Sequence, residues 1–135
     1  MPYDYRIDTN QKLIYANGHG NLTEENLASY VHNLKHDPDF DPLFNLFLDL
    51  TQVTKIEMPI EAIERSAKNP ILSPTSEIVI VAKSDIIYGT SRSFMAFKSP
   101  SSSKVHLFRT VDEAKKYLSL EKGAFKKPSC FKNSQ

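Results

Sequence analysis

The sequence has a single cysteine, Cys130, among its 135 residues. One cysteine cannot form an intrachain disulfide, which excludes a small secreted domain held by disulfides and leads us to expect a cytoplasmic protein. The sequence also lacks an excess of charge of one sign: it has 17 lysines and arginines and 16 aspartates and glutamates, for a net charge of +1. This balance argues against a dedicated nucleic-acid-binding protein, which needs a basic surface for phosphates.

Long hydrophobic runs are absent as well. The run EIVIVA is far shorter than the ~20 residues of a membrane-spanning helix, and the opening MPYDYRID has neither the basic nor the apolar region of a signal peptide. We therefore expect no transmembrane segment. The length suits one domain, which we place at residues 1–120, followed by a basic, disordered tail at residues 121–135 that holds four lysines and one glutamate.

Hydrophobic periodicity predicts an α/β fold with the order β-β-α-β-α-β-α-β-α. Alternating residues predict strands at 3–8 and 12–17, joined as an antiparallel hairpin. Apolar runs predict central parallel strands at 43–50 and 76–83, and 104–108 is predicted as a third parallel strand. The expected architecture is a mostly parallel five-stranded sheet with four helices.

The helices are predicted from their caps and apolar stripes. Thr23 begins the first helix, which ends near His36, and Pro59 lies in the first turn of the second, whose buried stripe includes Ile60. Ser84 or Asp85 caps the third helix. The sequence TVDE at 110–113 is a capping box that begins the fourth.

Four stretches carry a resemblance to a known fold group: YDYRID at 3–8, FLDL at 47–50, YGTSR at 88–92 and FRTVDEAKKYL at 108–118. They resemble the SpoIIAA-like proteins, which include the STAS domains, and most closely the small uncharacterised bacterial members of that group. The resemblance implies a non-enzymatic regulatory or protein-interaction domain.

The resemblance also locates a switch that this chain lacks. Anti-sigma-factor antagonists carry D-S-S-G after the central strand, with a serine that is phosphorylated. Here Glu57, Met58 and Pro59 followed by Ile60 stand at that place. Thr51 and Thr54 lie nearby, in an expected turn, where they either satisfy backbone groups or become modified.

In a parallel sheet, ligands meet the carboxyl ends of the strands, where loops and helix N-termini converge. We expect a partner- or anion-binding site there, or else only helix caps and solvated charges. The candidate residues are Asp49, Thr51, Thr54, Lys83, Ser84, Tyr88, Arg92 and Arg109, with Thr110 beside them.

Other candidate sites are weaker. His32 and His36 have the i,i+4 spacing of a zinc pair, but Asn33 replaces the glutamate of HExxH, so a solvated helix face is favoured and no metal or cofactor is expected. Several aromatic and methionine side chains could enclose an apolar pocket or form an ordinary core. They are Tyr30, Phe44, Phe47, Phe94, Met95 and Phe97.

Three functions follow from these patterns. The first is a STAS-like regulatory domain that binds a protein partner across its second and third helices. The alternative is a small-molecule or lipid-binding module with an apolar pocket at the strand ends. The third is an enzyme built on Asp49, Lys83 and Arg92, which no recognisable catalytic motif supports. A homodimer is also compatible with the sequence.

Overall fold

The computed structural model describes residues 3–122, which form one five-stranded sheet with the strand order β1-β2-β3-β4-β5. β1 and β2 are antiparallel, whereas β2, β3, β4 and β5 run parallel to one another. This confirms the predicted α/β order, the N-terminal hairpin and the parallel centre. The strands are β1 (Tyr3–Asp8), β2 (Leu13–Thr23), β3 (Asn45–Glu57), β4 (Glu77–Val81) and β5 (Lys104–Phe108).

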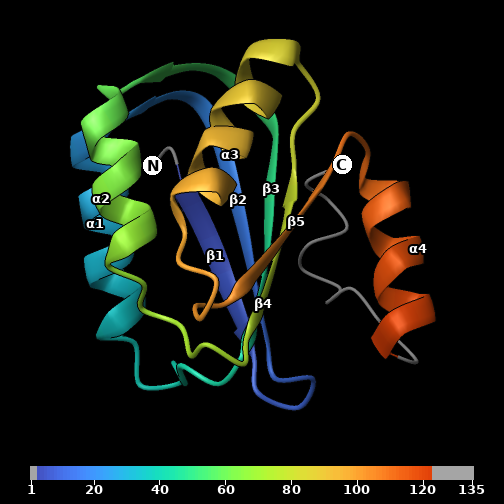
Figure 1. Cartoon of the computed structure of the whole chain (residues 1–135). Coiled ribbons are helices and arrows are strands. Elements are labelled where there is room, and N and C mark those ends of the chain that lie inside the picture. The colour runs from blue at the N-terminus through green and yellow to red at the C-terminus, as the bar shows by residue number, and fades with distance from the viewer. Residues whose placement is uncertain (1–2, 123–135) are drawn as a thin grey trace.

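The four helices cover the two faces of the sheet unequally. α1 (Glu24–Lys35), α2 (Ile60–Lys68) and α3 (Asp85–Phe97) lie on one face, and α4 (Val111–Lys122) lies on the other, as Figure 1 shows. α4 continues through Lys122, two residues past the expected domain end. The remainder of the expected tail, residues 123–135, lies outside the described residues.

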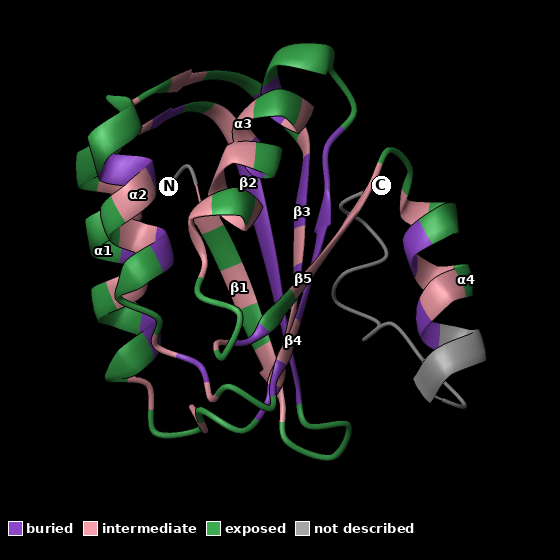
Figure 2. Cartoon of the chain, in the orientation of Figure 1, coloured by how far each residue is buried: buried purple, intermediate pink, exposed green. Residues whose placement is uncertain are grey.

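Each face of the sheet has its own apolar cluster, because successive strand residues point to opposite faces. Ile78 and Ile80 face α1, α2 and α3, while Val79 and Val81 face α4. Figure 2 shows the resulting run of buried residues along the central strands. On the α4 side, Ala114 and Leu118 are buried.

β2 and β3 are longer than predicted, and the turn expected at Thr51 and Thr54 is wrong. Beyond the five-stranded part, residues 19–23 of β2 pair only with residues 52–57 of β3, through two register shifts. We call this two-stranded extension the arm; in Figure 1 it arches over the top of the sheet towards α1 and α2. Gly20 takes a φ of 69° beside the second register shift, a conformation that glycine adopts without strain.

The helix starts follow the local chemistry. Thr23 Oγ1 accepts a hydrogen bond from the Asn26 N–H, and Asn26 Oδ1 accepts one from the Thr23 N–H, so the first helix is capped as expected. The buried stripe of α2 consists of Ala62, Ile63 and Ala67. Ile60 is 52% exposed, contrary to prediction.

Candidate functional site

The strand-end edge brings together three of its predicted residues. The Arg109 guanidinium donates to Asp85 Oδ1 at 2.7 Å and to the Lys83 carbonyl at 3.3 Å. Its Cζ also lies 3.9 Å from the centroid of the Tyr88 ring. The charge of Arg109 is therefore already paired and stacked, in a largely exposed position where such pairs contribute little stability.

Most other strand-end candidates have local structural partners. Asp49 is buried, and its Oδ1 accepts hydrogen bonds from the backbone N–H and the hydroxyl of Thr51 at 2.8 and 2.7 Å. Ser84 caps α3 by accepting from the Ile87 N–H, and Thr110 accepts from the Glu113 N–H at the start of α4. The structure does not gather these residues into one pocket.

Thr54 and Arg92 are not bonded to this edge group. Thr54 is an exposed residue of the arm, and Arg92 is exposed on α3. Neither has a side-chain hydrogen bond or ion pair to any described residue. The eight residues predicted as one site therefore divide into an arginine cluster, an aspartate–threonine pair, a helix cap and two separate side chains.

An apolar hollow lies elsewhere, between the sheet and the helices α1, α2 and α3. It has a volume of about 550 Å³ and is mostly apolar. Leu46, Leu48 and Leu50 of β3 line it on the sheet side, and Val31 of α1 and Phe94 of α3 line it on the helix side. We call this hollow the cavity; its volume falls within the about 300–1,000 Å³ typical of small-molecule sites.

The cavity lies where α1 packs only loosely against the pair formed by α2 and α3. α1 packs on β1 and β2, whereas α2 packs chiefly against α3. The arm brings the starting points of α1 and α2 close together, because Thr23 pairs with Glu57, and its residues Leu22 and Ile56 line the cavity. Leu46 and Leu48 remain partly exposed to the cavity even though β3 is the middle strand of the sheet.

The position of the cavity corrects the prediction of an apolar pocket at the strand ends. None of the eight strand-end candidates lines it. Of the side chains expected to enclose a pocket, Tyr30 and Phe94 do line it. Phe47 belongs instead to the cluster that faces α4.

A few polar groups stand in the apolar wall. Tyr30 is 8% exposed, and its hydroxyl has no hydrogen-bond partner among the described residues. Burial raises the pKa of Tyr30 well above its usual range. Arg65 also lines the cavity, and its guanidinium pairs with Glu24 of α1.

Lys98, which directly follows α3, is a half-buried charge in the cavity wall. Its Nζ lies 5.4 Å from the centroid of the Phe94 ring, and both side chains line the cavity. Burial lowers the pKa of the Lys98 ammonium, because removing water from a cation disfavours its charged form.

His32 and His36 contact each other at the end of α1. The rings of His32 and His36 lie 4.3 Å apart between centroids, and His36 Nδ1 is 2.9 Å from the His32 carbonyl oxygen. Among residues 3–122, no group of three or more histidines, cysteines, aspartates or glutamates is placed to hold a metal ion.

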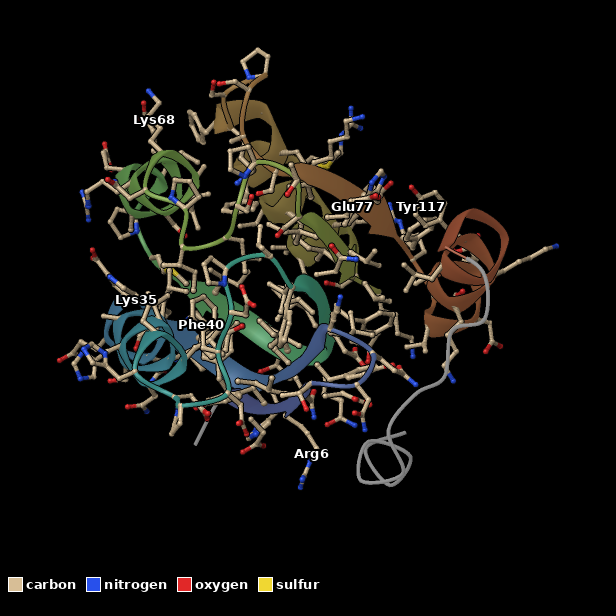
Figure 3. The ribbon with its side chains drawn as sticks, turned by 90° about the horizontal axis from the view of Figure 1, so that it is seen from below. Arg6, Lys35, Phe40, Lys68, Glu77 and Tyr117 are labelled. Atoms are coloured by element: carbon tan, nitrogen blue, oxygen red, sulfur yellow. The ribbon has the colours of Figure 1, made fainter. Side chains whose placement is uncertain are left out.

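Sequence reasoning missed a polar cluster between β4, β5 and α4. His106 Nε2 lies 2.9 Å from Glu77 Oε1, and the Tyr117 hydroxyl lies 3.3 Å from the same nitrogen and 3.4 Å from the same oxygen. Figure 3, a view from below, shows Glu77 and Tyr117 side by side. The cluster links α4 to the sheet edge, and no sequence spacing announces it because its members lie 11 to 40 residues apart.

Comparison with known proteins identifies the fold. No family model and no curated protein sequence matches the chain. The crystal structure of an uncharacterised DUF3478-family protein with a SpoIIAA-like fold, from Shewanella loihica PV-4, is similar, with a TM-score of 0.53 and 14% sequence identity. The match covers 86% of this chain and 93% of that protein.

This similarity confirms the SpoIIAA-like fold that the sequence motifs suggested. At 14% identity it concerns the fold alone, since one fold can support many functions. Within the described part of the chain, none of the helices has the length and hydrophobicity to span a bilayer.

Proposed function

We propose that this protein is a non-enzymatic, cytoplasmic binding domain that holds a small apolar molecule in the cavity. The observation that carries the proposal is the partial exposure of Leu46 and Leu48, on the middle strand, towards a hollow of about 550 Å³. A middle strand covered by helices is normally packed without voids.

The energetics favour an apolar occupant. Apolar surface released from water contributes about 25 cal/mol per Å², so a molecule that covers these leucines gains affinity without needing many hydrogen bonds. The wall offers few polar groups to fix a polar ligand, and those of Arg65 and Glu24 are already paired. The proposal therefore concerns an alkyl or other hydrophobic compound and no highly polar metabolite.

The direct test is a titration with dodecanol below the concentration at which it aggregates. We expect saturable binding with a 1:1 stoichiometry, measured by calorimetry, and a negative heat-capacity change, which marks apolar burial. Native mass spectrometry of the purified protein reports any molecule that copurifies. The absence of saturable binding for dodecanol and for dodecanoate would refute the proposal.

A second candidate function, the STAS-like regulatory role, is supported by a different surface. Ile60 begins α2 and Ile86 lies in the first turn of α3, and they are 52% and 77% exposed. The two helices pack side by side, and the cluster of Lys83, Tyr88 and Arg109 adjoins the start of α3. We propose this surface, with the strand-end edge, as the place where a protein partner would dock.

Ile86→Glu tests the partner surface. We expect it to weaken binding of a partner captured with the wild-type protein at least tenfold, because a buried interface isoleucine would be replaced by an unpaired charge. The free energy of unfolding should stay within about 0.5 kcal/mol, since the side chain is exposed. Lys68→Glu, on an exposed part of α2, is the control. Equal capture by wild type and Ile86→Glu would argue against this surface.

A further inference from the structure

The charged groups around the cavity are unevenly paired. Glu24 is the one carboxylate among the described residues that line it, and the Arg65 guanidinium is its partner. Lys35 and His36 also line the cavity but are exposed at the end of α1. Lys98 differs from these residues, because it is half-buried and has no ion pair with any described residue.

The surroundings of Lys98 suit an anion that arrives with an apolar chain. Its one side-chain contact among the described residues that involves its charge is the Phe94 ring, which offers weak attraction to a cation. A partly desolvated ammonium is stabilised much more by a hydrogen-bonded carboxylate than by an aromatic ring. An occupant that fills the hollow along Leu48 can bring such a carboxylate to the wall where Lys98 lies.

We infer that the ligand of the cavity is a single-chain anionic amphiphile of the fatty-acid class, whose carboxylate pairs with Lys98 while its alkyl chain covers the leucines of β3. This inference rests on the proposed function and adds the chemistry of the head group. Removal of water lowers the pKa of Lys98, and an ionised carboxylate beside it would raise that pKa again.

The test compares ligands that share one chain and differ in the head: dodecanoate, dodecanol and dodecyl phosphate. We expect the wild-type protein to bind dodecanoate at least about tenfold more tightly than dodecanol, because a hydrogen bond to a charged group exceeds the about 1.4 kcal/mol that tenfold represents. Calorimetric titration at one pH and one salt concentration measures all three.

Variants of Lys98 test whether this residue binds the carboxylate of the ligand. Lys98→Met should weaken dodecanoate binding by about tenfold and leave dodecanol binding nearly unchanged, which removes the preference. Lys98→Arg should retain most of the preference, since it keeps the charge. Lys83→Met, an exposed lysine outside the cavity, is the matched control and should behave as wild type.

The possible failures are distinguishable. Equal affinities of the wild type for dodecanoate and dodecanol would overturn the anionic head while the proposed function stands. Tighter binding of dodecyl phosphate than of dodecanoate would overturn the fatty-acid class in favour of a phosphate head. A Lys98→Met variant that keeps the full preference would remove Lys98 as the anchor. Failure of every ligand to bind would refute the proposed function itself.

Discussion

Leu48→Phe is expected to block the cavity without unfolding the protein. Leu48 lines the hollow from the middle strand and is partly exposed, so the larger ring can extend into empty space instead of into packed neighbours. If the ring displaces two methylenes of a bound chain, at about 0.8 kcal/mol each, the affinity for dodecanol falls about fifteenfold.

Two measurements check this result. Calorimetric titration gives the loss of affinity, and urea denaturation gives the free energy of unfolding, which should stay within about 1 kcal/mol of the wild type. Leu43→Phe is the matched control, because the same change occurs at a residue that is 66% exposed and outside the cavity. Unaltered dodecanol binding by Leu48→Phe would mean that the ligand occupies another site.

Leucine-to-alanine substitutions on the two faces of the sheet should have unequal costs. Leu118 of α4 is 3% exposed and belongs to the cluster with Val79 and Val81, so Leu118→Ala removes close contacts and leaves a void, at about 3 kcal/mol. Leu48 already borders empty space, so Leu48→Ala loses less buried area and should cost about 1 kcal/mol.

Urea denaturation of the two alanine variants measures the difference directly. An unchanged slope with denaturant concentration confirms that both variants unfold in one step from a similarly compact state. Leu118→Val serves as a milder control on the α4 face, with a cost between those of wild type and Leu118→Ala. Equal losses for Leu48→Ala and Leu118→Ala would show that Leu48 is as tightly packed as Leu118, which contradicts an open cavity.

Much of the fold is readable from the sequence because its signals are local. The run 76–83 is apolar enough to indicate a central strand, and 104–108 indicates a further parallel strand. Thr23 and Thr110 indicate helix starts through hydrogen bonds to residues three positions away. These signals need no knowledge of the tertiary structure. They also carried the resemblance to the SpoIIAA-like group, which the similarity of fold confirms.

The arm shows where local signals were misread. Thr51, Val53, Thr54 and Ile56 favour a strand by their β-branched side chains, yet the polar residues among them suggested a turn. The register shifts opposite Gly18 and Gly20 interrupt the simple alternation that identifies a strand. β-propensity weighed over the whole segment was the signal that could have found the arm.

The candidate sites were less predictable than the fold. The sequence placed Lys83, Tyr88 and Arg109 at one edge of the sheet, and there they do meet. It could not tell that Asp49 turns back to Thr51, or that His106 meets Glu77 and Tyr117, because such contacts depend on side-chain directions across separate elements.

The sequence by itself determined the order of strands and helices, the helix caps and the apolar character of the central strands. Only the tertiary structure decided that the face covered by α1, α2 and α3 is incompletely filled. Leu46 and Leu48 have the same sequence pattern in a closed core as in a ligand site. What distinguishes the two is the loose packing of α1 against α2 and α3, and the amount of side-chain volume that remains to fill the space between them.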